Sequence, residues 1–184
     1  MPNIEEAARE LGQIAQANVR QYSTRAHGLE MDTANRSVLV PNSQDGNILK
    51  AIRTKLKPGL VAYIGAKRFL DKTTPKGVSE IVIGLGRTQF DIIRLARTAA
   101  GNFGLTTADV VARLKKYHKI AGIDIVRADK NTIQFELLHL PSDFDAFVSE
   151  IYEFCPDIVD QGCGTIDVLA AEIRRYSSVF LWWD

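Results

Sequence analysis

The chain has few of the residues that build metal sites or disulfide scaffolds. Its 184 residues include two cysteines and three histidines, which is too few cysteines for a disulfide-rich fold. Cys155 and Cys163 do not have the close spacing usual for zinc ligands. Cys155 precedes a proline and has no evident neighbour that would activate its thiol. We therefore expect no metal, no cofactor and no cysteine nucleophile.

Long apolar runs and a surplus of charge are also missing. No apolar stretch approaches the ~20 residues of a membrane span. The first residues have neither the basic start nor the apolar run of a signal peptide. The net charge of +1 gives no bulk attraction to nucleic acid or to a membrane surface. These absences predict a cytoplasmic protein with no nucleic-acid or membrane partner, and they leave its oligomeric state open.

What is present is typical of a folded domain. Hydrophobic residues make up 46% and charged residues 24% of the chain, which are ordinary values. The length suits one domain, or one domain with an N-terminal appendage. We predict an N-terminal helix within residues 1–30 that packs on the body, followed by a single α+β domain over residues 31–184.

The periodicity of apolar residues predicts the elements. Helical spacing predicts helices over 3–22, 43–56, from 106, from 142 and from 165. Apolar or alternating runs predict strands at 37–40, 60–66, 78–84, 90–96, 123–128, 132–140 and 179–183. This order contains two βαββ-like halves, at 37–84 and 90–140, and the second half has a ferredoxin-like order. We expect a mixed, mostly antiparallel sheet with helices packed on it.

The last strand carries both tryptophans. Val179, Leu181 and Trp183 fall on one face, and Phe180 and Trp182 on the other. Both sets are apolar, which predicts a strand covered on both sides. One indole should enter the core, and the other either packs as well or serves as an anchor for a partner.

Polar residues gather between the last two predicted helices. Asp157, Asp160 and Gln161 follow a proline in a predicted loop, where Asp124 and Glu136 could join them if their strands are neighbours. One interpretation is a carboxylate pair at a cleft that binds a cation or takes a proton. The preferred one is structural, with short polar side chains bonded to the loop backbone. Asp184 and the terminal carboxylate should face a basic residue, such as Arg174 or Arg175.

Four segments in this order carry a family resemblance: FDIIRLART, TTADVVARLKKY followed by GIDIV, EIYEFCPDIVDQG and the final LWWD. Over about residues 90–184 the chain resembles the bacterial domain-of-unknown-function family 4253. That name implies no chemistry. The family is similar in character to the small cytosolic proteins that bacteria encode beside toxins.

The leading hypothesis is an interaction protein, more plausibly than an enzyme, and most plausibly an immunity-type protein that neutralises a cognate toxin. Its acidic tail would steer onto a basic surface, and an aromatic side chain would fill a cleft. The predicted partner-binding residues are Glu153, Asp157, Asp160, Gln161, Trp182 and Asp184. The alternative is a small-molecule-binding or hydrolytic enzyme domain with its pocket near Asp157, Asp160 and Gln161.

Overall fold

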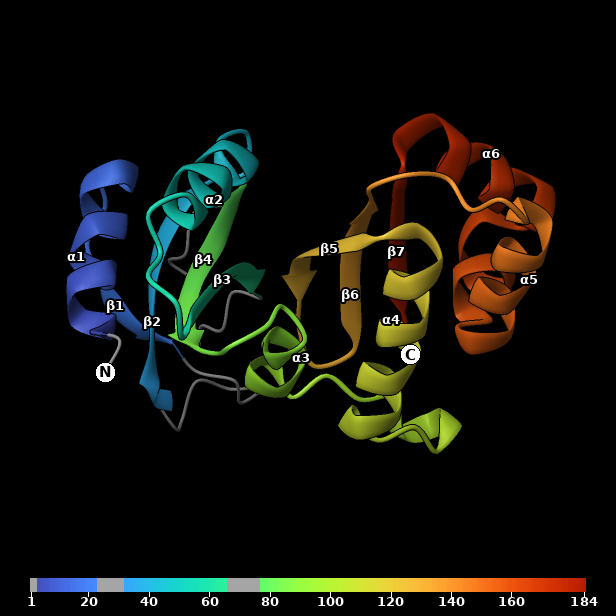
Figure 1. The fold of residues 1–184 in the computed structure, drawn as a ribbon, viewed down its shortest axis with the longest axis horizontal. Coiled ribbons are helices and arrows are strands. Elements are labelled where there is room, and N and C mark those ends of the chain that lie inside the picture. The colour runs from blue at the N-terminus through green and yellow to red at the C-terminus, as the bar shows by residue number, and fades with distance from the viewer. Residues whose placement is uncertain (1–2, 23–31, 66–76) are drawn as a thin grey trace. The chain divides into compact units, whose positions relative to one another are not determined.

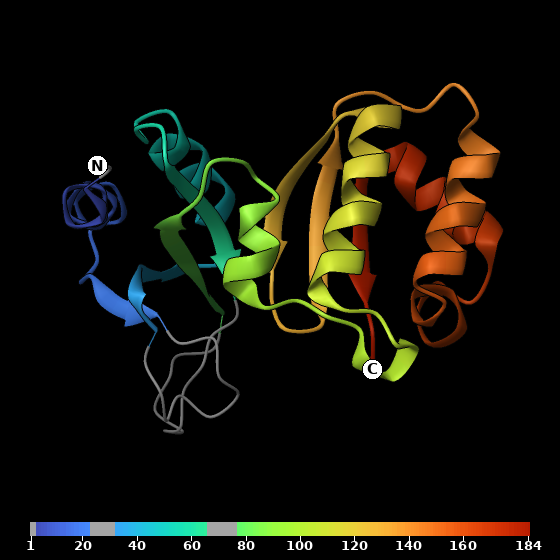
Figure 2. The same ribbon diagram turned by 60° about the horizontal axis from the view of Figure 1, so that its bottom comes forward.

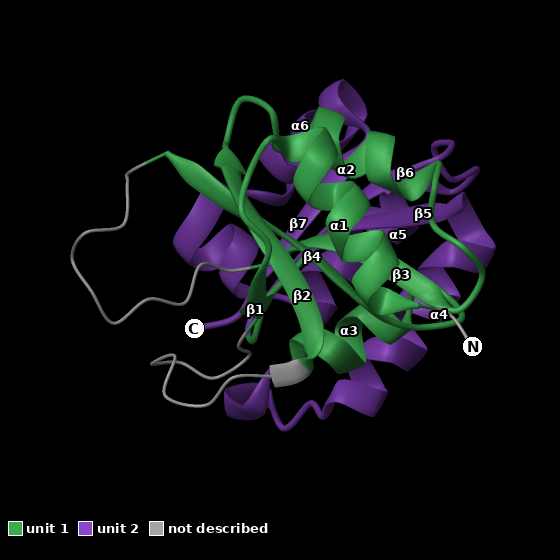
Figure 3. Ribbon diagram, turned by 90° about the vertical axis from the view of Figure 1, so that its left-hand side faces the viewer, with its two compact units in different colours: residues 1–97, 128–130 green, residues 98–127, 131–184 purple. Residues whose placement is uncertain are grey.

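The structure is a computed structural model that describes residues 3–22, 32–65 and 77–184. Helices and strands alternate along the chain, which confirms the predicted α+β class (Figure 1). The chain divides into two compact units: Met1–Arg97 with Ala128–Lys130, and Thr98–Arg127 with Asn131–Asp184 (Figure 3). The boundary predicted between residues 30 and 31 lies outside the described residues.

Unit 1 contains a four-stranded antiparallel arrangement in the order β1-β2-β4-β3. β3 is buried along its whole length, as its unbroken apolar sequence predicts. Helices α1 and α2 contact each other, and α1 also contacts β2. The elements are α1 (Ile4–Ala15), β1 (Arg20–Tyr22), β2 (Asp32–Pro41), α2 (Asp45–Arg53), β3 (Leu60–Gly65), β4 (Val78–Leu85) and α3 (Asp91–Ala96).

The first helix is shorter than predicted. Asn3 caps it by accepting from the backbone N–H groups of Glu5 and Glu6, as expected of a short polar side chain at this position. It ends at Gln16, which adopts a left-handed conformation with φ 49°. The chain then forms β1, so the periodicity assigned to residues 17–22 did not reflect a helix.

The segment predicted as a strand at 90–96 is helix α3. The Asp91 carboxylate accepts from the N–H groups of Arg87 and Thr88, which fixes the turn that starts the helix. Ile92, Ile93 and Ala96 are buried, a spacing that fits one helix face. The second half therefore begins with helices. The βαββ pattern and the ferredoxin-like order were both predicted to begin with a strand at 90–96. That strand is absent because these residues form helix α3.

Unit 2 has the strand order β5-β6-β7, with β6 and β7 antiparallel. Helix α4 follows Thr106, where a helix was predicted to begin, and opens with a capping box in which the Thr106 and Asp109 side chains each bond the other residue's backbone. The elements are η1 (Gly101–Phe103), α4 (Thr107–Ala121), β5 (Ile123–Ala128), β6 (Thr132–Leu137), α5 (Phe144–Phe154), η2 (Ile158–Cys163), α6 (Ile166–Tyr176) and β7 (Ser178–Trp182).

A chain of aromatic rings forms the core of unit 2. Tyr117 on α4 lies between Phe135 of β6 and Phe147 of α5, with ring centroids 6.1 and 5.4 Å away. Phe154 continues the chain to Trp183, 5.3 Å away in an edge-to-face arrangement. Helix α4 lies over β6 and β7 in two views (Figures 1 and 2). The strand residues that point to this core, Ile133, Phe135, Val179 and Leu181, are buried.

The prediction that the last strand is covered on both sides is wrong. β7 ends the strand order of the described residues, so one of its edges has no strand beside it. Val179, Leu181 and Trp183 are buried, but Phe180 is 50% exposed. Apolar side chains on both faces suggested a central strand. The structure instead leaves an exposed aromatic beside a groove.

Candidate functional site

The C-terminal segment turns back on itself around η2, a short π-helix. Asp143 caps α5 by accepting from the N–H of Ala146, and Thr165 caps α6 by accepting from the N–H of Val168. Ser177 ends α6 in a left-handed conformation, φ 48°. This tight reversal starts β7 directly after the helix. The end of α6 and the start of β7 therefore lie side by side.

Trp183 anchors the tail in the core. It is 2% exposed, and its Nε1–H donates to the Phe154 carbonyl at 3.1 Å. Its backbone N–H donates to the Asn131 carbonyl, and its carbonyl accepts from the Asn131 side chain. Trp183 is thus the indole that enters the core, with its N–H satisfied as burial requires.

Cys155 is bonded to the backbone at the outer edge of β7. Its thiol donates to the Trp182 carbonyl at 2.9 Å and accepts from the Trp182 N–H at 3.3 Å. Burial raises the pKa of the Cys155 thiol to about 12, because the charged thiolate is disfavoured away from water. The thiol is therefore protonated at neutral pH and serves as a hydrogen-bonding partner for one residue of the strand.

The polar residues of the predicted loop hold the tail together. Asp157 is buried, and its two oxygens accept from the Gln161 side chain at 3.0 Å and the Asp184 N–H at 2.9 Å. The main-chain oxygen of Asp184 accepts from the Asn102 side chain at 2.7 Å. The partner of the Asp184 main chain is therefore a side-chain amide, whereas a basic residue was predicted there. Arg174 instead pairs with Asp145.

The predicted partner-binding residues do not form one surface. Asp157, Gln161 and Asp184 form the hydrogen-bonded group just described. Asp160 is exposed and accepts from the Tyr152 hydroxyl at 3.1 Å, which raises the pKa of that phenol. Glu153 lies exposed on α5. Of the predicted set, Trp182 is the residue that lines the groove beside β7.

This groove, called the β7 groove below, has a volume of about 740 Å³. Phe180, which is 50% exposed, and Tyr176, which is 62% exposed, present aromatic surface there. Part of its lining is apolar, since Leu169 and Ile173 of α6 are buried there. The lining comes from β6, η2, α6 and β7: Gln134, Glu136, Ile158, Gly162, Cys163, Leu169, Glu172, Ile173, Tyr176, Ser178, Val179, Phe180 and Trp182.

The charged residues that line the β7 groove are acidic. Glu136 on β6 and Glu172 on α6 are both exposed, and the lining contains no Lys or Arg. The guanidinium of Arg175 lies 5.1 Å from the ring centroid of Tyr176, outside the lining. Sequence reasoning did not select Phe180, Tyr176 or Glu172. The signal for Phe180 was its place beside Trp182 on the same face of the last strand.

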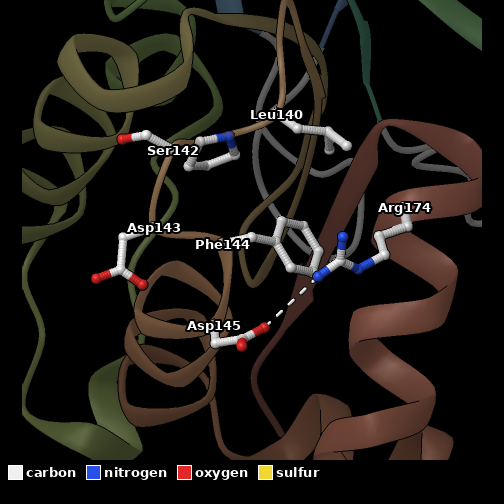
Figure 4. Close-up of a pocket in the computed structure, with 7 residues that line it drawn as sticks. Leu140, Ser142, Asp143, Phe144, Asp145 and Arg174 are labelled. Atoms are coloured by element: carbon white, nitrogen blue, oxygen red, sulfur yellow. Dashed lines mark ion pairs between the residues drawn. The ribbon is translucent and has the colours of Figure 1, made fainter.

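A second hollow lies at the start of α5 and has a volume of about 580 Å³. The Arg174 guanidinium lies 3.9 Å from the ring centroid of Phe144 and 3.6 Å from the Asp145 carboxylate (Figure 4). Asp143, which also lines it, caps the helix. The charged side chains of this hollow therefore form an ion pair, a cation–π contact and a helix cap. These contacts give them a structural role.

Unit 1 buries a carboxylate of its own. Glu80 on β4 is 1% exposed, and its oxygen accepts from the Ser37 hydroxyl at 2.6 Å. The Arg20 guanidinium lies 3.7 Å from the same oxygen. A buried charge needs such partners to offset the loss of water. This group therefore joins β1, β2 and β4.

Residues 81–184 match the family described as a domain of unknown function, DUF4253. The match spans more than half of the chain, so the chain belongs to this family. Comparison with curated proteins and with solved structures found no match. The family segment contains the whole of the β7 groove.

The described residues lack the features of two other kinds of site. No helix among them combines the length and apolar character needed to cross a membrane. They also contain no group of three or more His, Cys, Asp or Glu side chains placed to hold a metal ion.

Proposed function

We propose that this chain is a protein-binding module whose interface is the β7 groove, and that its partner is a toxin that it neutralises. The observation that carries the proposal is the joint exposure of aromatic and acidic side chains around one groove. Phe180 and Tyr176 supply aromatic surface, and Glu136 and Glu172 supply negative charge. Aromatic residues dominate the binding energy of many interfaces.

The carboxylates select the kind of partner. Negative charge around a binding surface speeds association with a basic protein and disfavours an acidic one. It also repels the phosphates of nucleic acid, whose binding depends on Lys and Arg. A basic protein surface with a side chain that enters the groove fits these features. Such a module can inhibit a toxin by covering its active cleft.

The arrangement of Asp157 gives the alternative enzyme no further support. A catalytic carboxylate must be within reach of a reacting group. Both oxygens of Asp157 are instead taken up by Gln161 and the Asp184 backbone. These bonds are explained by their role in holding the tail.

The test is co-expression with the product of the adjacent gene in a bacterial host. We expect that product to stop growth when expressed alone, and the full chain to restore growth. The double reversal Glu136→Lys with Glu172→Lys should abolish this protection. A product that is harmless alone, or equally toxic in the presence of this chain, would contradict the proposal.

A matched control makes the same charge change elsewhere. Glu153 and Asp167 are exposed and lie outside the groove lining, so Glu153→Lys with Asp167→Lys should leave protection intact. Glu153 is also one of the residues predicted from sequence. Loss of protection in the control, with protection kept in the groove variant, would place the interface around Glu153 or Asp167 and reject the groove.

A further inference from the structure

The outer edge of β7 presents backbone groups to the β7 groove. In an antiparallel pair, residues alternate between those whose N–H and C=O bond the neighbouring strand and those whose groups point away from it. Trp183 donates to Asn131, and Leu137 donates to Ser177. In the register of β6 and β7, Leu181 and Val179 therefore bond β6. The groups of Ser178, Phe180 and Trp182 point away from β6.

The bonds of Cys155 agree with this alternation. Its thiol takes up both the N–H and the C=O of Trp182 from the side opposite β6. Two residues earlier, the N–H and C=O of Phe180 point the same way, and no described group bonds them. The Phe180 side chain lines the groove. The edge position at Trp182 is thus closed by a thiol, while the adjacent position, Phe180, has no described hydrogen-bond partner on this side and belongs to the lining of the acidic groove.

We propose that the β7 groove receives a short, basic, extended segment of the partner protein, which pairs with β7 as an additional strand. This inference rests on the proposed protein-binding function and specifies how the groove binds. Strand addition supplies affinity through main-chain hydrogen bonds and specificity through alternate side chains. Lys or Arg side chains on the groove side of the segment would meet Glu136 and Glu172.

The length of the segment follows from the geometry. β7 spans Ser178–Trp182, and its Trp182 end is closed by Cys155. The start of the strand is closed by the turn from α6, in which the Ser177 N–H bonds the Ile173 carbonyl. The open edge therefore suits about four residues of extended chain at roughly 3.3 Å each. A segment of this length pairs through few hydrogen bonds, so the acidic side chains are needed for affinity.

The test uses the full chain and a blocked seven-residue peptide of alternating lysine and valine as the probe. Titration calorimetry should show binding, with no binding to the glutamate–valine counterpart. Binding should also slow hydrogen exchange at the Phe180 amide. The key comparison is between Phe180→Ala, which removes the side chain but keeps the N–H, and Phe180→Pro, which removes both. Proline is tolerated where the N–H of an edge strand points outward, and thermal unfolding confirms that each variant is folded.

We expect Phe180→Pro to bind the lysine–valine peptide about tenfold more weakly than Phe180→Ala. Proline removes the backbone N–H that would bond the peptide, and its ring also crowds the strand edge where the peptide would pair. Two N-methylated peptides give an independent readout, one methylated at every lysine and the other at every valine. Only one edge of the peptide can face β7, so one methylated peptide should bind and the other should not. Equal binding by the two Phe180 variants, or by both methylated peptides, would overturn strand addition.

The outcomes separate this inference from the proposed function. If reversal of Glu136 and Glu172 abolishes protection against the toxin while Phe180→Pro and Phe180→Ala protect equally, the groove remains the interface and strand addition is wrong. Sedimentation of the chain alone tests another occupant. A dimer that Phe180→Pro dissociates and Phe180→Ala does not would show that the edge pairs with a second copy, which also overturns the proposal.

Discussion

Two adjacent tryptophans at the end of the chain occupy opposite environments. Trp183 is buried among aromatic rings and bonded through its indole and its backbone. Trp182 lines the β7 groove and is partly exposed. The same comparison holds along the strand, where Val179 and Leu181 are buried and Phe180 is half exposed. The strand thus stabilises unit 2 with one face and presents a surface with the other, and mutations on the two faces should separate these roles.

The largest effect is expected from a chain that ends at Phe180. This deletion removes Leu181 and Trp183 from the core and the Asp184 N–H from Asp157. Truncating one buried Trp costs about 3–5 kcal/mol, so the whole deletion approaches the ~5–15 kcal/mol stability of a typical domain. Far-ultraviolet circular dichroism should show unit 2 unfolded at room temperature. A melting temperature within a few degrees of the full chain would mean that the strand is peripheral.

Single substitutions of the two tryptophans sharpen the comparison. We expect Trp183→Ala to lower the free energy of unfolding by about 3–5 kcal/mol, because the cavity cannot close around the lost ring. Trp182→Ala should cost about 1 kcal/mol, as is usual for a partly exposed residue. Urea unfolding of both variants measures the difference. Equal losses would indicate that both indoles contribute to the core.

The buried thiol gives a dependence on pH. The pKa of Cys155 is raised to about 12, from an ordinary value of about 8.5. The folded state therefore holds the proton more tightly than the unfolded state. This contribution to stability is complete below about pH 8.5 and is lost as the pH rises toward 12.

Urea midpoints between pH 7.5 and 10 should fall more steeply in the natural chain than in Cys155→Ala. Burial also raises the pKa of Tyr117 from its ordinary value near 10, but Tyr117 is present in both proteins, so the difference between their slopes isolates the thiol. Parallel slopes in the two proteins would contradict the assignment. A thiol reagent at pH 8 should modify Cys163, which is partly exposed, and leave Cys155 intact in the folded chain.

The smallest effect on stability is expected at Phe180. Its side chain is half exposed, so Phe180→Ala should change the free energy of unfolding by less than about 0.5 kcal/mol. The same substitution should weaken toxin protection, because the ring is part of the proposed interface. Unfolding and growth assays on one preparation compare the two effects. A large loss of stability would show that Phe180 contributes to folding instead of belonging to the exposed, binding face of β7.

The sequence predicted the elements whose local signals agree with their packing. The apolar run of β3 and the capping box at Thr106 and Asp109 both led to correct assignments. The signal at 90–96 was misleading because FDIIRLA suits a buried strand as well as a helix. The bonds from Arg87 and Thr88 to Asp91 depend on the turn before it, and apolar periodicity does not reveal them.

The candidate site was harder to predict because its parts meet only in three dimensions. The preferred prediction for Asp157 and Gln161 was hydrogen bonding to the loop backbone, whereas Asp157 bonds the Gln161 side chain and the backbone N–H of Asp184. The sequence predicted that one indole enters the core, which holds for Trp183, but it left the environment of the other open. Glu136 and Glu172, 36 residues apart in the sequence, come together because α6 ends beside β7. No single stretch of the sequence indicates that these two residues line the same groove. Strand alternation identified the faces of β7, but not that it lies at an edge.

The bond between Cys155 and Trp182 also bears on how the protein behaves at high concentration. Exposed strand edges template aggregation, and natural proteins shorten or cover them. By occupying the backbone of Trp182, the thiol limits how much of β7 another chain can join. A bulky adduct on this sulfur would lengthen the exposed edge. We therefore expect the thiol to oppose edge-to-edge aggregation at high concentration, a role distinct from its share in the core.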